Sequence, residues 1–242
     1  RPAVGDRVFG APGMGFGANA ERFVLAAEDA HPMPEGLTFE AAATLPVAGR
    51  EAIGYLAKGG VDGTKRVLIR GASGAIGTYA VQLAKQMGAH VTAVGGRGTA
   101  ALLEELGADV AWDHTVHDFD ADPSARFDVM IDVVGRTPFR RCLAVLAPDG
   151  VLVRCTIPGV PEVLGALWVR LSSRQRVIQG EGGGSTPALL ALAASIGCGE
   201  VKAVIDRVLP LDQAAEAHRY VEAGQKTGHV VLTCDPDAGP GS

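Results

Sequence analysis

Seven residues from Gly71 to Gly77, Gly-Ala-Ser-Gly-Ala-Ile-Gly, have the composition of a turn that binds phosphate groups. The apolar run 66–70 before this turn predicts a β-strand, and the residues after it predict a helix. At such a turn, backbone N–H groups and the positive end of the helix dipole converge and can bind a diphosphate. Gly74 lets the backbone approach the phosphates, and Gly77 lets helix and strand pack closely. We therefore predict that this turn binds a dinucleotide through five residues, Ser73, Gly74, Ala75, Ile76 and Gly77.

This fingerprint is less specific than the commonest form, because Ala72 stands where the first glycine usually occurs. An ordinary tight turn between a strand and a helix is the alternative interpretation. The surrounding sequence favours binding, since the strand, the turn and the helix continue into a complete βαβ pattern.

The end of the next predicted strand, residues 90–94, indicates which dinucleotide the turn binds. Sites that prefer NAD carry an Asp or Glu there, which accepts hydrogen bonds from the ribose 2′-hydroxyl group. This sequence continues instead with Gly95-Gly96-Arg97-Gly98, which offers space and a guanidinium suited to a phosphate. We therefore predict NADP as the cofactor, with Arg97 at its 2′-phosphate. The alternative is that Arg97 is a solvated loop cation.

These residues need a parallel sheet to position them, and the sequence predicts one. Between residues 66 and 156, short β-branched apolar runs alternate with helical segments, which is typical of consecutive βαβ units. The predicted strands are 66–70, 90–94, 110–112, 127–134 and 151–156, and helices are predicted after the glycine turn, at 99–106 and at 139–146. The predicted fold class is therefore α/β, with a doubly wound parallel sheet of the Rossmann type.

Ligands of such sheets lie at the carboxyl ends of the strands, where two further groups of candidate residues occur. Val133, Val134 and Gly135 end one predicted strand, and Cys155 and Thr156 end another. We predict that both groups contact the cofactor. For Val133 the alternative is a structural role as a buried strand residue.

The two ends of the chain differ from this central region. Residues 1–38 predict short antiparallel strands around a glycine-rich stretch, and residues 177–234 predict strands and two helices. Residues 235–242 predict a disordered tail. The chain begins without the features of a signal peptide, and its start at Arg1 indicates that an upstream part is missing.

Composition argues against several classes of protein. A net charge of −5 with 20% charged residues gives no basic surface for nucleic acid, and no apolar run approaches the roughly 20 residues that cross a bilayer. Four cysteines stand far apart, which argues against a zinc site and fits a reduced, cytoplasmic protein. No metal site is predicted, and no acid–base pair or activated nucleophile is recognisable, so the catalytic residues stay unknown. A small-molecule substrate is the expected partner.

Ordered motifs along almost the whole chain resemble the medium-chain dehydrogenase/reductase superfamily, in particular its zinc-free quinone oxidoreductase-like and NAD(P)-dependent alcohol dehydrogenase-like branches. The motifs are Val4-Gly5-Asp6-Arg7-Val8-Phe9-Gly10, Ala43-Thr44-Leu45-Pro46, the turn 71–77 with Ala80-Val81-Gln82-Leu83-Ala84-Lys85, Leu106-Gly107-Ala108-Asp109, Phe127-Asp128-Val129 with Asp132-Val133-Val134-Gly135, Val204-Ile205-Asp206-Arg207-Val208 and Glu216-Ala217-His218-Arg219-Tyr220.

The resemblance implies a Rossmann domain at residues 39–176, inserted into a partial GroES-like domain formed by residues 1–38 and 177–234. It implies that the first part of the GroES-like domain is absent from this chain, and that the protein forms a homodimer through an edge strand of the Rossmann sheet. Zinc-dependent relatives carry a metal ligand near the position of Val47, whose aliphatic side chain cannot coordinate a metal. The resemblance therefore implies no catalytic zinc. The resemblance places Val133–Gly135 near the adenosine and ribose, and residues 155–156 near the nicotinamide.

Three positions depart from the family pattern. Relatives usually carry Tyr where this chain has His114, and Lys or Asn near the cofactor where it has His229. Both histidines are therefore predicted cofactor contacts, with an exposed loop residue as the alternative for His114. Relatives usually carry Thr in place of Glu51, whose carboxylate either repels the cofactor phosphates or points outward from its helix.

The predicted function is zinc-independent hydride transfer from NADPH to a quinone or an α,β-unsaturated carbonyl compound. One alternative is an NAD(P)-dependent alcohol dehydrogenase, which needs a Lewis acid or proton donor that the sequence does not reveal. The other is a cofactor-binding module with impaired catalysis, which Glu51 and the missing first segment favour.

Overall fold

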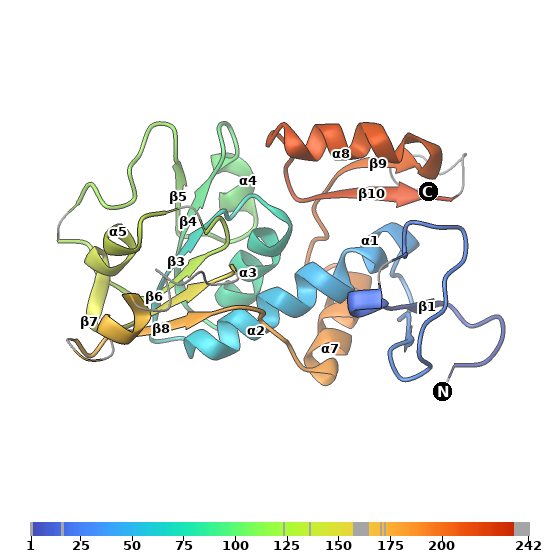
Figure 1. Cartoon of the computed structure of the whole chain (residues 1–242), viewed down its shortest axis with the longest axis horizontal. Coiled ribbons are helices and arrows are strands. Elements are labelled where there is room, and N and C mark those ends of the chain that lie inside the picture. Colours follow the sequence, from blue (N-terminus) through green and yellow to red (C-terminus); the bar gives the residue numbers. More distant parts are fainter. Residues whose placement is uncertain are drawn as a thin grey trace. The chain divides into compact units, whose positions relative to one another are not determined.

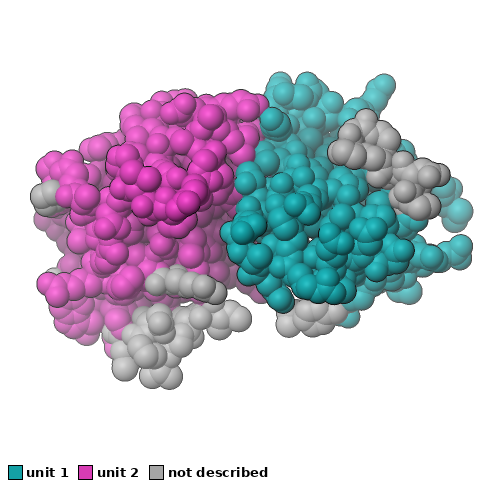
Figure 2. Space-filling view, turned by 90° about the horizontal axis from the view of Figure 1, so that it is seen from above, with its two compact units in different colours: residues 1–50, 186–242 teal, residues 51–185 magenta. Residues whose placement is uncertain are grey.

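The structure is a computed structural model that describes residues 2–15, 17–122, 124–135, 137–156, 165–169, 171 and 173–234. The chain forms two compact units, residues 1–50 with 186–242 and residues 51–185, which Figure 2 distinguishes by colour. The predicted disordered tail, residues 235–242, lies outside the described residues.

One parallel sheet of six strands forms the centre of the unit of residues 51–185 (Figure 1). Its strands are β3 (Arg66–Arg70), β4 (His90–Gly95), β5 (Val110–Asp113), β6 (Phe127–Asp132), β7 (Leu146–Arg154) and β8 (Arg176–Gln179). Their order is β5-β4-β3-β6-β7-β8, and every neighbouring pair is parallel. The chain winds outward from β3 in one direction and from β6 in the other, which confirms the predicted doubly wound fold.

Two boundaries of this sheet differ from the sequence prediction. Strand β8 is the sixth member of the sheet, paired with β7, and the compact unit continues to Ser185, whereas the predicted Rossmann domain ends at residue 176. Strand β6 ends at Asp132 rather than at Val134, because the chain bends before Gly135, whose φ is +69°.

Helices cover both faces of the sheet. They are α2 (Arg50–Gly59), α3 (Ala75–Gln86), α4 (Ala100–Glu105) and α5 (Phe139–Ala144). A Cβ added to Gly59 of α2 would lie 2.9 Å from Val129, while Cys142 of α5 belongs to the buried cluster that contains Met130. Successive strand residues point to opposite faces, so α2 and α5 pack on opposite sides of β6.

The central strands are buried on both faces, as their nearly continuous apolar sequences require. Leu68 and Ile69 of β3 are fully buried, as are Met130 and Ile131 of β6. Full burial of such a side chain stabilises the fold by about 1.5–3 kcal/mol. This rigid centre holds the ends of the strands, where the candidate site lies.

Residues 1–50 and 186–242 form a unit with two separate small sheets. Strands β1 (Val8–Phe9) and β2 (His31–Pro32) pair antiparallel, as predicted for the start of the chain, and β9 (Ile205–Pro210) pairs parallel with β10 (His229–Thr233). The helices are α1 (Phe39–Ala43), α7 (Thr186–Gly197) and α8 (Ala214–Glu222), with a π-helical segment Leu45–Gly49 and 3-10 turns Gly13–Gly15 and Leu211–Gln213. No helix in the described part of either unit has the length and apolar character needed to span a membrane.

Candidate functional site

The glycine turn joins β3 to α3 in a conformation fixed by backbone hydrogen bonds. The N–H groups of Gly71 and Ala72 both donate to the carbonyl oxygen of Val94, each at 3.0 Å, and Gly71 has a φ of +80°. A Cβ at Gly77 would lie 2.2 Å from the carbonyl oxygen of Gly71, so no larger residue fits without moving the backbone. The predicted requirement for glycine at position 77 is therefore visible in the packing of helix against turn.

The first N–H groups of α3 are available to a ligand. Gly74 caps the helix with extended backbone, so the N–H groups of Ala75, Ile76 and Gly77 are the first three of the helix. N–H groups at these positions have no acceptor within an α-helix, and the helix dipole adds partial positive charge. A Cβ at Gly74 would touch only the Gly71 carbonyl oxygen, at 3.3 Å, which leaves the other side of Gly74 open. The turn can therefore bind an anion such as a diphosphate.

Ser73 connects this turn to the end of β4. Its hydroxyl oxygen accepts a hydrogen bond from the N–H of Gly96 at 3.1 Å, and its side chain is buried. A Cβ at Gly95 would lie 2.3 Å from the hydroxyl of Thr99 and 3.3 Å from the Cβ of Ser73. The structure thus brings together the predicted phosphate turn and the predicted specificity loop.

His114 and Arg97 both lie beside the end of β4. Arg97 is exposed, and Nδ1 of His114 lies 2.9 Å from the carbonyl oxygen of Gly95. The two residues thus follow the neighbouring strands β4 and β5 at the carboxyl end of the sheet, and their contact with a cofactor stays a prediction.

Asp113 is a charged neighbour that the sequence reasoning missed. It pairs in register with Gly95, and its carboxylate accepts hydrogen bonds from the N–H of Thr115 at 2.8 Å and from that of Gly98 at 3.3 Å. Hydrogen bonds from the Thr115 side chain and backbone hold the pKa of Asp113 below its usual value. Only the parallel register of β4 and β5 reveals this carboxylate, since it is 18 residues from Gly95 in the sequence.

The ends of β6 and β7 bring together the second set of predicted cofactor residues. A Cβ at Gly135 would lie 2.0 Å from Cγ2 of Thr156, so these two residues are in contact. Val133 follows β6 directly, with its N–H donating to the carbonyl oxygen of Arg70, and the side chain of Val134 is exposed. Cys155 and Thr156 follow β7 and are partly exposed. All five predicted residues therefore lie at one edge of the sheet.

A buried charge network supports this edge, and the sequence did not reveal it. Asp132 is fully buried between two guanidinium groups, 3.5 Å from Nη1 of Arg70 and 3.5 Å from Nε of Arg154. Arg154 also donates to the carbonyl oxygens of Gly135 and Thr137. Asp132 in turn accepts the N–H of Gly135 at 3.1 Å. The network thus holds the turn that carries the predicted residues 133–135.

The carboxylate of Glu51 binds a neighbouring loop of its own unit. It accepts the N–H of Gly182 at 2.7 Å and the N–H of Gly183 at 3.3 Å. Helix α2 and this loop touch through their backbones, since a Cβ at Gly54 would lie 2.2 Å from the carbonyl carbon of Gly182. Lys58, seven residues after Glu51 on α2, donates to the carbonyl oxygen of Glu181 at 2.5 Å. The sequence offered two interpretations of Glu51: its carboxylate repels the cofactor phosphates, or it points outward from the helix. The structure shows neither, because the carboxylate binds the loop after β8.

Tyr55 is buried beside Glu51 and near Cys155, which is partly exposed. Burial raises the pKa of the Tyr55 hydroxyl, and hydrogen bonds to Glu51 and Cys155 raise it further. Burial likewise raises the pKa of the Cys155 thiol to about 12. Both groups keep their protons at neutral pH, so Cys155 is not a thiolate nucleophile there.

His229 lies in β10, in the unit of residues 1–50 and 186–242, whereas the other predicted cofactor residues lie in the unit of residues 51–185. Its Nδ1 lies 3.1 Å from the carbonyl oxygen of Val204, and its side chain is buried. Burial, together with the charge of Lys226, lowers the pKa of His229 to about 4.

The lowered pKa of His229 predicts a loss of stability in acid. The unfolded chain binds a proton at its histidine near pH 6.5, whereas the folded chain resists protonation down to about pH 4. The free energy of unfolding should therefore fall by about 3 kcal/mol as the pH drops through this window. Urea unfolding at several pH values measures this loss. A His229→Gln variant should lack this part of the pH dependence, and an unchanged slope in the variant would contradict the assignment.

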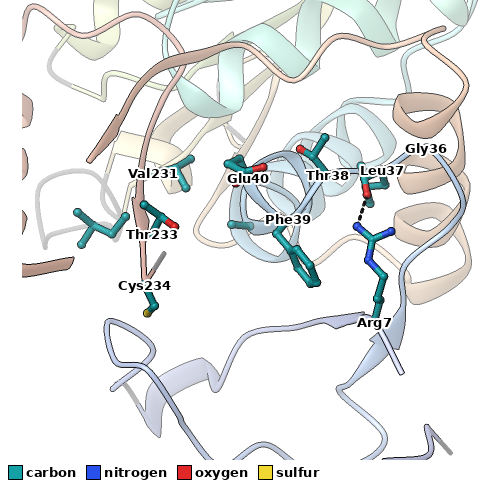
Figure 3. Close-up of a pocket in the computed structure, with 11 residues that line it drawn as sticks. Arg7, Gly36, Leu37, Thr38, Phe39, Glu40, Val231, Thr233 and Cys234 are labelled. Carbon is teal, nitrogen blue, oxygen red and sulfur yellow. Dashed lines mark hydrogen bonds between the residues drawn. The ribbon is translucent and has the colours of Figure 1, made fainter. Parts of the chain in front are cut away.

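A separate hollow of about 630 Å³ lies within the unit of residues 1–50 and 186–242, beside α1 and β10. Figure 3 shows the residues that line it. Arg7, which directly precedes β1, lines this hollow, and its guanidinium donates to the carbonyl oxygen of Leu37 at 2.8 Å. Its Cζ atom lies 4.7 Å from the centroid of the Phe39 ring. Glu40 also lines the hollow. None of the predicted cofactor residues lines it. Among the described residues of the whole chain, no group of three His, Cys, Asp or Glu side chains is placed to hold a metal ion.

The doubly wound sheet and its glycine turn define a Rossmann-type α/β domain, and comparison with known proteins identifies the family. The family model for "Zinc-binding dehydrogenase" matches residues 106–232, or 127 of the 242 residues. The chain therefore belongs to this family of dehydrogenases, within the medium-chain dehydrogenase/reductase superfamily. This confirms the resemblance seen in the sequence motifs.

Individual relatives cover almost the whole chain. A mitochondrial NAD(P)H oxidoreductase of Mus musculus is 30% identical, matching 94% of this chain and 64% of its own length. A 2-methylene-furan-3-one reductase of Solanum lycopersicum is 32% identical, matching 90% of this chain and 53% of its own length. The solved structure of a quinone oxidoreductase from Coxiella burnetii superposes with a TM-score of 0.79 at 27% identity, covering 87% of this chain and 65% of that one. The chain thus spans between about half and two thirds of the length of these relatives.

Proposed function

We propose that this protein binds NADPH on the glycine turn and transfers hydride to a quinone or an α,β-unsaturated carbonyl compound. One observation carries the proposal. The turn that leads to the first N–H groups of α3 is joined to the loop that bears Arg97 by the hydrogen bond from Gly96 to Ser73. The names of the related furanone reductase and quinone oxidoreductase support the class of acceptor.

The residues of the turn fit the diphosphate of a nicotinamide cofactor. Its backbone supplies donors from Ala75, Ile76 and Gly77, and the absence of a side chain at Gly74 leaves space for the phosphates. Val133, Val134 and Gly135 would contact the adenosine and ribose, and Cys155 and Thr156 the nicotinamide. The bound nicotinamide supplies the hydride, and the role of the protein is to bind it, orient it and exclude water.

The choice of NADP over NAD rests on Arg97, which is exposed and forms no ion pair with any described residue. A guanidinium at this position is suited to the 2′-phosphate. Asp113 opposes this preference, because its negative carboxylate would repel a 2′-phosphate. The carboxylate lies close to this position, since it accepts the N–H of Gly98, next to Arg97. We therefore expect a moderate preference for NADPH rather than an exclusive one.

Catalysis without zinc is part of the proposal. Val47, in the π-helical segment, stands near the position where zinc-dependent relatives carry a ligand, and its aliphatic side chain cannot coordinate a metal. The raised pKa values of Cys155 and Tyr55 keep both groups protonated at neutral pH, so neither acts as a general base there. Solvent is the proposed source of the proton that the reduced product takes up. Activity that survives dialysis against EDTA would support this part of the proposal.

We further propose a cytoplasmic homodimer that joins two copies of β8, the last strand of the parallel sheet in the order of Figure 1. Four free cysteines support a reducing compartment. The unit of residues 1–50 and 186–242 is the proposed counterpart of the partial GroES-like domain. Sedimentation of wild type and of an Arg176→Glu variant, which reverses the charge of the exposed first residue of β8, tests the interface.

Fluorescence titration with NADPH and NADH tests cofactor binding, and turnover assays with a quinone and an enone test the reaction. We expect micromolar binding of NADPH, weaker binding of NADH, and oxidation of NADPH that depends on the acceptor. Binding without turnover of any acceptor would favour the alternative of a module with impaired catalysis. Oxidation of primary or secondary alcohols in place of acceptor reduction would favour the alcohol dehydrogenase alternative. Equal affinity for both cofactors would contradict the role of Arg97.

A further inference from the structure

The loop after β8, residues 180–185, depends on other elements for its conformation. Four of its six residues are glycine, and two of these, Gly180 and Gly183, have φ values of +101° and +67°. A segment so rich in glycine loses much conformational entropy when it becomes ordered, and it has few side chains of its own to pack. Contacts with a neighbouring element must therefore hold this loop in place.

Helix α2 supplies such contacts through the side chain of Glu51. One carboxylate oxygen accepts the N–H of Gly182 at 2.7 Å, and the other accepts the N–H of Gly183 at 3.3 Å. The two backbones also touch, since a Cβ at Gly182 would lie 2.4 Å from the carbonyl oxygen of Glu51. Two charge-assisted hydrogen bonds from successive N–H groups fix both the position and the direction of the loop. An amide of the same size has only one acceptor oxygen and cannot replace both bonds.

The same carboxylate is connected to Cys155 through Tyr55. The side chain of Tyr55 is buried, and its hydroxyl forms hydrogen bonds with Glu51 and with Cys155. A carboxylate can only accept, so the single hydrogen of the hydroxyl is donated to Glu51. The thiol of Cys155, which keeps its proton, is then the donor to the Tyr55 oxygen. One carboxylate thus connects the loop after β8 with the residue that follows β7.

These connections lie where the proposed function places the nicotinamide, since Cys155 and Thr156 are its proposed contacts. Strands β7 and β8 are neighbours, and the N–H of Gly180 donates to the carbonyl oxygen of Arg154 at 3.3 Å. The loop therefore begins beside Cys155. The proposed sites of the diphosphate and the ribose follow β3 and β4, which β6 and β7 separate from β8 in the strand order (Figure 1). Glu51 thus acts at one end of the proposed cofactor site.

We propose that Glu51 is a positioning residue that holds the loop 180–185 as a wall of the nicotinamide site and so orients the nicotinamide for hydride transfer. This role rests on the proposed function. Glu51 acts through the loop and through Tyr55, without touching the cofactor. The threonine that relatives usually carry has one hydroxyl oxygen in place of two carboxylate oxygens, so this double anchor is particular to the present chain.

Two ligands separate the halves of the cofactor in calorimetric titrations of the full chain. 2′,5′-ADP contains only the adenosine half, whereas NADPH contains both, so the ratio of their affinities measures the contribution of the nicotinamide half. Glu51→Gln keeps the size of the side chain but turns an NH₂ group toward one of the two N–H donors. Asp149→Asn is the matched control, because it makes the same change at an exposed position beside the amino end of β6, where Leu146 pairs with Phe127.

We expect Glu51→Gln to lower the ratio of NADPH affinity to 2′,5′-ADP affinity by about tenfold. The affinity for 2′,5′-ADP itself should stay within about twofold of wild type, because its site lies at distant strands. Stopped-flow mixing of the NADPH complex with a quinone should show hydride transfer that is slower by roughly tenfold to a hundredfold, since a displaced ring leaves the reactive geometry. Asp149→Asn should match the wild type in all three measurements.

Tyr55→Phe provides a second measurement that does not depend on the folding of Glu51→Gln. It keeps the buried ring and removes only the hydroxyl that joins Glu51 to Cys155. We expect it to lower the affinity ratio by about threefold, and the double variant to be no weaker than Glu51→Gln alone, because both changes act through one connection.

Three outcomes would contradict these expectations in different ways. An unchanged affinity ratio in Tyr55→Phe and in Glu51→Gln, with urea unfolding showing that the proteins are folded, would overturn the role of Glu51 and leave the proposed cofactor site intact. An equal loss of affinity for NADPH and 2′,5′-ADP would also overturn it, because it would show an effect on the whole domain. Failure of both ligands to bind the wild type would overturn the proposed function itself.

Discussion

Replacing Gly77 with alanine should weaken the binding of NADPH about a hundredfold, because roughly two charge-assisted hydrogen bonds to the diphosphate would be lost. The added Cβ would lie 2.2 Å from the carbonyl oxygen of Gly71 and 2.6 Å from Cα of Ala72. Both are backbone atoms, so the start of α3 must move away from the turn. That movement turns the N–H groups of Ala75 and Ile76 away from the position where both would donate to the diphosphate.

The same substitution should lower the free energy of unfolding by about 1–3 kcal/mol, since overpacking forces the backbone to shift. Gly74→Ala is the matched comparison. Its Cβ would meet one atom, the Gly71 carbonyl oxygen at 3.3 Å, and its extended backbone suits alanine. We expect Gly74→Ala to retain most of the stability and to lose affinity through its methyl group in the phosphate space. Fluorescence titration and urea unfolding of both variants separate the two effects, and full NADPH affinity in Gly77→Ala would contradict the assigned site.

The features that the sequence predicted depend on local pattern. The period of apolar residues in 66–70 and 90–94 determines two strands, and the glycines of the turn determine how the first strand meets its helix. The two strands, the turn and the helix lie within one βαβ unit, where few topologies compete. The hydrogen bond from Gly96 to Ser73, which joins the turn to the end of the second strand, was not predicted and is seen only in the structure.

The features that the sequence missed depend on register or on distant segments. Asp113 is next to Gly95 only because β5 and β4 pair in that register. Glu51 binds Gly182, which lies 131 residues further along the chain. A helical glutamate usually faces solvent, so nothing in the residues around Glu51 indicated its hydrogen bonds to this loop. The end of β6 was misplaced because Val133 and Val134 have high β propensity, whereas the turn at Gly135 and its contacts decide where the strand stops.

The charge network at Asp132 is the largest such omission, and it predicts a large effect on stability. Asp132→Asn should lower the free energy of unfolding by about 3–5 kcal/mol, because it leaves a buried guanidinium without its counter-ion. Asp132 is fully buried, the side chain of Arg154 is 4% exposed, and that of Arg70 is 21% exposed. Arg154 thus has little access to water, whereas Arg70 can turn toward solvent. The effect should therefore come mainly from Arg154.

Two further variants test this explanation by urea unfolding. Arg70→Met should cost less than Asp132→Asn, since Asp132 keeps Arg154. The double variant Asp132→Asn with Arg154→Met should recover much of the loss, because no uncompensated charge remains in the interior. Asp149→Asn is the matched control: its ion pair with Arg174 spans 3.7 Å between side chains that are 71% and 81% exposed, and such a pair contributes about 0–1 kcal/mol. If the double variant were less stable than Asp132→Asn alone, the buried charge of Arg154 would not be the cause. The hydrogen bonds from Arg154 to Gly135 and Thr137 would then outweigh it, and the network would act mainly by holding the turn beside the proposed cofactor site.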